Sequence, residues 1–313
     1  MVSPTFHPIG PGYPAPLDRL FDEEAAMWKS NLAWGFEPTR KRLRAALRED
    51  ALEGFIAADP GGPCGYATFS MNGGQGVVGN IFALPRARGI EEALARRVLE
   101  VLMARHPETI DCQTLFMSDP GLRTPFASFG FSTARRIYMT LDRVAWRRPV
   151  EHPIPEPARP VRQGDVNVVS RLVFEAHADS REQDASSSFD TQESCDRILQ
   201  QIVFDGICGP FDSDASRWIG RDARAASACL VTWPMPGIAH VSEVATAPGH
   251  RRAGLARHCL SRSIENAFER GGAERITLSV TASNSAARAL YHSMGFEDRV
   301  LYGSHLFRRG APR

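Results

Sequence analysis

One short segment of the chain, residues 244–256, combines the residue types that bind a phosphate group. It begins with an apolar stretch typical of a strand, passes through a turn and enters a helix. The N-terminus of a helix presents unpaired backbone N–H groups and a positive dipole end, and both favour anions. Gly254 lets the main chain approach a ligand closely, Ala256 keeps the first helical turn free of bulk, and Arg251 and Arg252 add positive charge. The spacing Arg251-x-x-Gly254-x-Ala256 therefore predicts a pyrophosphate loop, without the Lys-Ser/Thr ending of a nucleotide P-loop.

The residues after this loop predict a regular order of helix and strand. Apolar residues at helical spacing indicate a helix from Leu255 to Phe268, and two glycines at 271–272 end it. Residues 275–280 have the pattern of a strand. Residues 284–291 then predict a short helix, which Met294-Gly295-Phe296 closes.

The loop and this last block together resemble the GNAT superfamily of N-acetyltransferases. Both Arg251-x-x-Gly254-x-Ala256 and Asn284-x-x-Ala287-x-x-Leu290-Tyr291-x-x-x-Gly295-Phe296 occur in the family's order and spacing, within residues 160–309. The resemblance implies an α/β (α+β) fold, a mixed twisted sheet flanked by helices, with a splayed pair of strands that admits the pantetheine arm of the cofactor. It also implies acetyl-CoA (coenzyme A) as co-substrate, with direct transfer to an amine.

The composition is that of an ordinary globular protein and excludes several other classes. The chain has 313 residues, which favours two domains over one. The net charge of +1 gives no reason to expect nucleic acid or a membrane surface as a partner. Its N-terminus lacks the features of a secretory signal, so we expect a cytoplasmic protein. We expect the protein to be a monomer or a homodimer. The six cysteines have no C-x-x-C pair or regular spacing, which indicates reduced thiols and no metal site.

The first half of the chain repeats the second half weakly. The prolines of residues 149–160 predict a stiff, extended linker between an N-terminal domain at 1–148 and a C-terminal domain at 161–313. In the N-terminal domain, Gly130-Phe131 corresponds to Gly295-Phe296. Before it we expect an early strand at 65–69, an amphipathic helix from Ile90 to Leu102 and a strand at Gln113–Met117. This order predicts a tandem pair of GNAT-type acyltransferase domains.

The N-terminal copy differs where the chemistry would take place. Aligning the two Gly-Phe pairs puts Phe126, which has no hydroxyl, opposite Tyr291, and Asp119 opposite Asn284. Pro125 disturbs the helix that would present Phe126. The loop at 86–91 is two residues shorter than its counterpart, and Glu91 in place of a small residue would repel phosphate. We therefore expect a degenerate N-terminal domain with a structural or substrate-shaping role; a second acyl-CoA site or an effector pocket is the alternative.

The resemblance implies catalytic roles for three residues of the C-terminal domain. Tyr291 lies where family members place a tyrosine near the cofactor sulfur, so it is the candidate proton donor. His240 lies where several members carry the general base, and its ordinary pKa suits that task. Glu243 is the rival base: strict alternation puts it on the face opposite His240, Ser242 and Val244, but a bulge in this strand would change which side chain faces the cleft. A chain of ordered waters is a third possibility.

The remaining candidate residues bind the cofactor. Backbone N–H groups of Val244, Ala245 and Thr246 are carried over as donors to pantetheine and to the oxyanion. Asn284 is expected to bond the pantetheine arm or to cap the helix that follows, and the two roles are compatible. The full set expected to contact the cofactor is Val244, Ala245, Thr246, Arg251, Arg252, Ala253, Gly254, Leu255, Ala256, Asn284, Ala287 and Tyr291.

The acceptor should bind beside the first helix of the C-terminal domain. Asp165 can cap a helix that continues to Ala176, and an acidic run follows at 177–190. This run would suit a cationic amine, although a solvated surface loop explains it equally. We expect a primary amine of a small molecule as the acceptor. The alternatives are a protein or peptide N-acetyltransferase and a non-catalytic acyl-CoA-binding sensor module.

Overall fold

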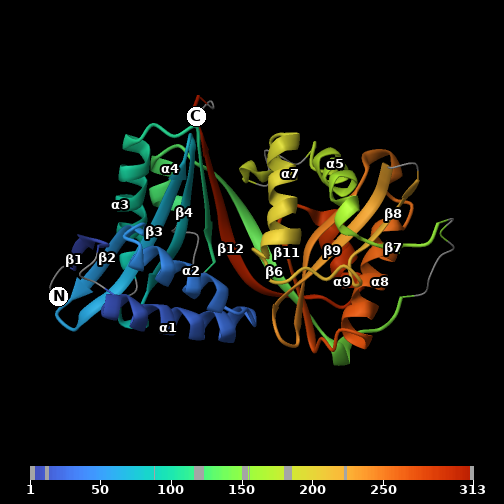
Figure 1. The fold of residues 1–313 in the computed structure, drawn as a ribbon, viewed down its shortest axis with the longest axis horizontal. Coiled ribbons are helices and arrows are strands. Elements are labelled where there is room, and N and C mark those ends of the chain that lie inside the picture. Colours follow the sequence, from blue (N-terminus) through green and yellow to red (C-terminus); the bar gives the residue numbers. More distant parts are fainter. Residues whose placement is uncertain are drawn as a thin grey trace. The chain divides into compact units, whose positions relative to one another are not determined.

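The chain forms two compact units, and in each of them helices pack against strands (Figure 1). The computed structural model describes residues 4–10, 14–87, 89–115, 123–149, 154, 156–179, 185–221 and 224–310; at 14–16 and 123–124 it describes the backbone only. The N-terminal unit comprises Met1–Arg135 and Leu301–Arg313, and the C-terminal unit comprises Arg136–Val300.

In the N-terminal unit, the sheet order is β1-β2-β3-β4-β5-β12, and neighbouring strands are antiparallel except for the parallel pair β4 and β5. The strands are β1 (Thr5–Pro8), β2 (Glu53–Asp59), β3 (Gly62–Asn72), β4 (Gln75–Ala83), β5 (Thr109–Thr114) and β12 (Glu297–Arg308). The helices are α1 (Pro14–Leu32), α2 (Glu37–Arg48), α3 (Ile90–Ala104) and α4 (Arg123–Ser128).

The C-terminal unit repeats this arrangement. Its sheet order is β7-β8-β9-β10-β11-β6, and again a single neighbouring pair, β10 and β11, is parallel. The strands are β6 (Ser132–Asp142), β7 (Arg159–Pro160), β8 (Arg217–Arg221), β9 (Arg224–Met235), β10 (Ile238–Thr246) and β11 (Arg275–Thr281). The main helices are α5 (Val166–Ala176), α7 (Gln192–Gln200), α8 (Leu255–Glu269) and α9 (Ser285–Ser293). The repeat predicted from the sequence is therefore present in the topology.

The two halves of the chain exchange their last strands. β6 follows Gly130-Phe131 in the first half, yet from Arg136 on it pairs with β11 of the C-terminal unit. β12 follows Gly295-Phe296, yet its end pairs with β5 of the N-terminal unit. The compact units therefore differ from the predicted domains at 1–148 and 161–313. The Gly-Phe pattern marks where a last strand begins, but it carries no information on which sheet that strand joins.

Most of the predicted helices and strands agree with the structure, but the predicted bounds of one strand were wrong. The expected helices are α3, α5, α8 and α9, and residues 65–69 lie in β3. The strand expected at Gln113–Met117 is β5 at Thr109–Thr114, where buried and exposed residues alternate and the outward side chains are polar. Met117 and Asp119 lie outside the described residues.

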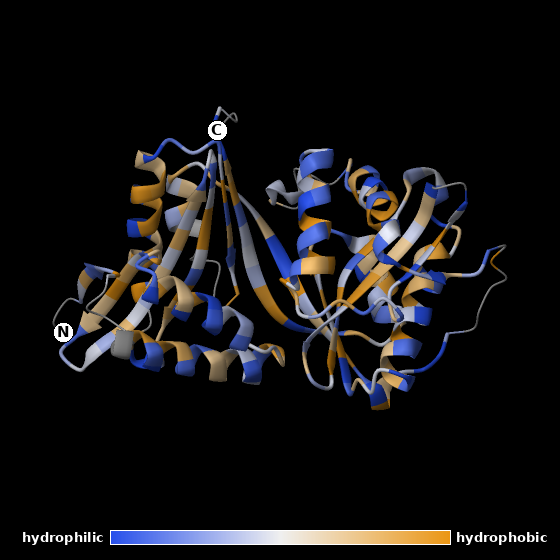
Figure 2. Cartoon of the chain, in the orientation of Figure 1, coloured by the Kyte–Doolittle hydropathy of each residue, from blue (hydrophilic) through white to orange (hydrophobic). Residues whose placement is uncertain are grey.

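Each unit has a core of its own, and the sheet of the C-terminal unit is covered on both faces. One core lies under α8 and α9, and another lies under α5 and α7. In Figure 2 the helices carry both hydrophilic and hydrophobic colours, as expected for helices with one buried side. Burying a large apolar side chain stabilises the fold by about 1.5–3 kcal/mol. The fully or almost fully buried side chains of α8 include Leu255, Cys259, Leu260, Ile264 and Phe268.

Among the described residues, no helix is both long and apolar enough to cross a membrane. The same part of the chain contains no group of three or more His, Cys, Asp or Glu side chains that could hold a metal ion.

The exchanged strand β12 offers a matched pair of substitutions. Leu306 is 1% exposed and lies opposite Asp111 of β5, whereas Leu301 is 54% exposed. We expect Leu306→Ala to destabilise the N-terminal unit by about 2–5 kcal/mol because it leaves a cavity, and Leu301→Ala to cost less than about 0.5 kcal/mol. Amide hydrogen exchange at Ile110 and Cys112 of β5 measures the effect. Equal exchange rates in the two variants would contradict the exchanged pairing.

Candidate active site

The parallel strands β10 and β11 separate at one end of their ladder. Their pairing ends at Val241 opposite Leu278, although the strands continue to Thr246 and Thr281. Beyond Val241, the edge of β10 that faces β11 has no strand partner in the described part of the chain. The opening expected between two splayed strands is therefore present, and the main chain of residues 244–246 lines it.

A β-bulge puts His240 and Glu243 on the same face of the sheet. His240 lies opposite Thr232 of β9 and Glu243 lies opposite Leu230, with a register shift between Val241 and Glu243. Thr232 and Leu230 are two residues apart on β9 and share a face, so their partners do as well. Strict alternation of side chains would put His240 and Glu243 on opposite faces of the sheet. The bulge makes that expectation wrong for this strand.

His240 is buried and its ring is held by neighbouring side chains. Its Nδ1 lies 2.9 Å from Thr277 Oγ1, and its ring lies nearly parallel to that of Tyr138. Burial and, to a smaller extent, the positive charge of Arg136 lower the pKa of His240 to about 3. The imidazole is therefore neutral at neutral pH and is a weak base.

Glu243 lies in a more open place, next to the end of α5. Its side chain is 12% exposed, and its Oε1 lies 3.4 Å from Nε2 of His177, whose side chain is 20% exposed. The His177 ring stacks on Phe189 with the centroids 3.8 Å apart. His177 and Phe189 both belong to the run at 177–190 that was expected to flank the acceptor, of which residues 180–184 lie outside the described residues.

Tyr291 is a buried phenol whose hydroxyl is available to a ligand. The residue is 7% exposed, and its ring meets Phe296 edge to face at 5.9 Å. Burial raises the pKa of the phenol well above its usual value, and the nearby Glu243 and Cys229 raise it further. The hydroxyl keeps its proton at neutral pH and has no hydrogen-bond partner among the residues that the structure describes.

The predicted pyrophosphate loop is an open cradle at the start of α8. A 3-10 turn at Pro248–His250 is followed by Arg252 and Gly254, whose φ angles are +66° and +80°. Gly254 is the N-cap of α8 and provides no side-chain cap, so the first N–H groups of the helix are left for a ligand. A Cβ atom at Gly254 would meet only Ile154, at 3.8 Å.

The two arginines of this loop differ in their surroundings. Arg251 donates a hydrogen bond to the carbonyl oxygen of Ala176 at 2.9 Å and pairs with Asp179 at 3.0 Å. Arg252 is exposed and has neither a hydrogen bond nor an ion pair from its side chain within the described part of the chain. Arg251 thus ties the loop to the end of α5, and Arg252 is the charge left for an anion. The loop fits a pyrophosphate group.

Two further candidate residues lie at the start of α9. Asn284 Oδ1 accepts a hydrogen bond from the backbone N–H of Ala287 at 3.1 Å, which is the capping role expected from the sequence. Ala287 packs against the core under α8 and α9. Asp165, in contrast, was expected to cap α5, but its side chain accepts from the N–H of Arg162 and caps the preceding turn.

The N-terminal unit contains a shortened and occupied version of the cradle. A 3-10 turn at Pro85–Ala87 precedes Gly89, the N-cap of α3, which has a φ of +96°. Glu91 Oε2 accepts a hydrogen bond from the N–H of Gly89 at 2.7 Å, so a carboxylate takes the place that an anion would need. Phe126 is fully buried and stacks on His305 with the centroids 3.9 Å apart.

Sequence reasoning missed the residues that set the electrostatics of this site. Arg136 and Tyr138 lie on β6, which was assigned to the other domain, and Thr277 lies on β11. A hydrophobic pattern identifies a strand but not its neighbours in the sheet, so nothing in the sequence brought these three residues next to His240. His177 was within a segment that the sequence did single out.

Comparison with known proteins supports the tandem fold and gives a family match for part of the chain. Residues 182–296 match the model of the Acetyltransferase (GNAT) family. No curated protein matches the chain. A solved tandem GNAT protein from the clavulanic acid biosynthesis pathway is 16% identical, with 99% of this chain and 100% of that chain covered and a TM-score of 0.61.

Two other solved structures are similar over almost the whole chain. A GCN5-related N-acetyltransferase from Sphaerobacter thermophilus is 19% identical, with 97% and 95% of the two chains covered and a TM-score of 0.67. The glucosamine N-acetyltransferase region of a fungal multi-domain GH3 β-N-acetylglucosaminidase is 11% identical, with 98% and 38% covered and a TM-score of 0.64. The chain therefore has the fold of these tandem GNAT structures, and its residues 182–296 match the GNAT family.

Proposed function

We propose that the C-terminal unit transfers an acetyl group from acetyl-CoA to a primary amine of a small molecule. The observation that carries this proposal is the separation of β10 and β11 beside Glu243 and Tyr291. A strand opening, a carboxylate and a protonated phenol whose pKa that carboxylate raises suit acyl transfer to an amine.

The cofactor would lie along the opening and end at the cradle. The main chain of Val244, Ala245 and Thr246 would pair with the pantetheine arm, and the start of α8 with Arg252 would hold the pyrophosphate. When bound, the thioester supplies an activated acyl carbon and a thiolate leaving group. A backbone N–H at 244–246 would donate to the carbonyl oxygen as it becomes negative.

Glu243 is the better candidate for the general base. His240 is buried, neutral and weakly basic, since its pKa is about 3. Glu243 lies on the same face of the sheet because of the bulge, and it retains exposure next to His177. Glu243 would accept a proton from the ammonium form of the acceptor, directly or through water.

Tyr291 would supply the proton that the leaving sulfur requires. Its raised pKa keeps the phenol protonated, and its hydroxyl has no competing partner in the described part of the chain. The negative charge of Glu243 that raises this pKa is lost once the carboxylate has taken a proton from the amine. Proton uptake at Glu243 would thus make Tyr291 a better donor at the step where a donor is needed.

The acceptor would enter beside His177 and Phe189. Glu243 offers a negative charge, and the stacked rings of His177 and Phe189 offer a flat apolar surface next to it. This combination of a negative charge and a flat apolar surface suits a small cationic amine. Two similar structures, one from the clavulanic acid biosynthesis pathway and one a glucosamine N-acetyltransferase region, support a small acceptor.

The proposed activity is tested with acetyl-CoA and a panel of primary amines, with release of free thiol as the readout. We expect amine-dependent thiol release by the native chain. Tyr291→Phe should lower turnover about a hundred- to ten-thousandfold while acetyl-CoA binding, measured by calorimetry, stays unchanged. Arg252→Glu should instead weaken binding, because it puts a negative charge at the cradle. A native chain that neither binds acetyl-CoA nor releases thiol with any amine would refute the proposal.

The choice of base is tested by two matched substitutions. Glu243→Gln should lower kcat/KM about a hundred- to ten-thousandfold and remove the acidic limb of the pH–rate profile. His240→Gln should stay within a few fold of the native enzyme and keep that limb. The reverse pattern would return the role of base to His240.

The protonation state of His240 is tested separately through stability. Its folded pKa of about 3 lies below the ordinary value of 6.5, so the unfolded chain binds more protons between these two pH values. The stabilisation by neutral His240 should be complete above pH 6.5 and be lost as the pH falls toward 3. The difference in unfolding free energy between the native chain and His240→Gln should therefore shrink as the pH falls from 6.5. A difference that is constant with pH would show that the pKa is not lowered.

A further inference from the structure

A charged cavity lies in the C-terminal unit, at the C-terminal half of α8. Its volume is about 460 Å³, and its lining includes Ala158, Pro160 and Asn266. Its charged lining consists of four arginines and two glutamates: Arg148, Arg217, Arg262, Arg270, Glu265 and Glu269.

The positive charges of this cavity exceed the negative ones. Four arginines and two glutamates give a formal charge of +2, that is, +4 − 2. Glu265 is shared by two of the arginines: its Oε1 lies 2.7 Å from Arg148 Nε, an ion pair without hydrogen-bond geometry, and its Oε2 accepts from Arg262 at 3.1 Å. Arg270 and Glu269 are both exposed.

Arg217 is a nearly buried cation without a partner. It begins β8 and is 9% exposed, and its guanidinium makes no hydrogen bond or ion pair with any residue that the structure describes. Burial lowers its pKa, and Arg270 and Arg162 lower it further, while Asp214 and Asp212 oppose them. Leaving a guanidinium buried and unpaired is costly unless a ligand satisfies it.

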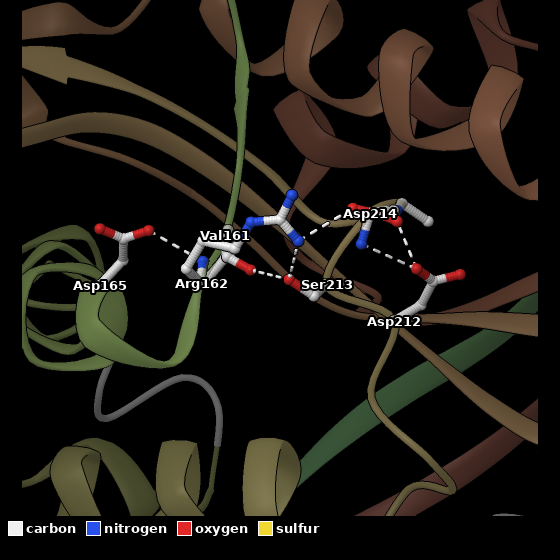
Figure 3. A network of polar contacts seen from close by, with 7 residues as sticks. Val161, Arg162, Asp165, Asp212, Ser213 and Asp214 are labelled. Carbon is white, nitrogen blue, oxygen red and sulfur yellow. Dashed lines mark hydrogen bonds and ion pairs between the residues drawn. The ribbon is translucent and has the colours of Figure 1, made fainter.

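The two carboxylates nearest in sequence to Arg217 are engaged elsewhere, as Figure 3 shows. Asp212 accepts from the backbone N–H groups of Asp214 and Ala215 and from Trp233 Nε1. Asp214 accepts from Arg162 at 2.9 Å. The turn before β8 therefore uses its own acids internally and leaves Arg217 to face the cavity.

The cavity is separate from the cradle of the proposed active site. Arg262 and Arg270 lie along α8 about 10 Å and 20 Å from its first residue, at a rise of 1.5 Å per residue. The negative C-terminal end of α8 favours the arginines on that helix. It does not account for Arg217, which comes from a strand and is buried.

We propose that this cavity binds a small molecule bearing a doubly negative oxyanion group, either a phosphate monoester or a dicarboxylate. Such a group matches the excess of two positive charges. The guanidinium of Arg217 supplies paired N–H donors in the geometry that phosphate and carboxylate oxygens accept. Arg270, which is exposed and also lines the cavity, supplies a second cation.

Inorganic phosphate and succinate are the probes, titrated calorimetrically into the full chain at constant ionic strength. The titrations use the Arg252→Glu variant, so that binding at the cradle does not interfere. We expect saturable binding of one of the two probes at one site per chain. Stronger binding of phosphate assigns the phosphate monoester, and stronger binding of succinate assigns the dicarboxylate.

Three further substitutions on this background distinguish the site from general charge attraction. Arg217→Met should weaken binding about ten- to a hundredfold, the effect of one charged hydrogen-bonding partner. Arg270→Glu, at an exposed position, should weaken it in the same direction and tests the site even if Arg217→Met does not fold. Arg197→Met removes an equal charge from the exposed surface of α7, where Arg197 pairs with Glu193, and should leave binding unchanged. No saturable binding at millimolar concentration, or equal losses in all three variants, would overturn the proposal.

Discussion

The candidate active site depends on the point where β10 and β11 stop pairing. Up to Val241 and Leu278, β10 and β11 pair with each other; beyond that point, within the residues that the structure describes, β10 pairs with β9 alone. An unpaired strand edge inside a protein is unstable unless water or a ligand satisfies it. The bulge at this place turns Glu243 to the face of His240, so one local irregularity both ends the alternation and presents the carboxylate.

The three candidate titratable groups differ in their surroundings. His240, sealed between Thr277 and Tyr138, loses its basicity and becomes part of the packing. Tyr291, buried beside a carboxylate, holds its proton firmly. The side chain of Glu243 is 12% exposed and lies beside His177. The residue types alone favour His240 as a base because its ordinary pKa is near neutral, and only its surroundings remove that advantage.

The sequence predicted the local elements well and the relations between strands poorly. The cradle, the cap at Asn284 and the helices α3, α5, α8 and α9 follow from glycine positions, capping residues and apolar spacing, which are local signals. The bulge between Val241 and Glu243 depends on how β10 fits β9, and the partners of β6 and β12 depend on edges far away in the chain. Arg136 and Tyr138 therefore could not be assigned to the site, although each is easily read as part of a strand.

Because the two halves exchange strands, the proposed catalytic unit also includes residues from the first half of the chain. β6 comes from the first half of the chain, yet it pairs with β11 along Arg136–Asp142 and brings Arg136 and Tyr138 to the surroundings of His240 and Tyr291. The part of the chain after the linker therefore does not contain β6, which is one strand of the sheet of the C-terminal unit. In the N-terminal copy Glu91 fills the cradle and Phe126 is buried, but the chain of this copy still completes the sheet of the C-terminal unit. The last strand of each compact unit therefore comes from the other half of the chain, so neither half alone contains all the strands of its unit.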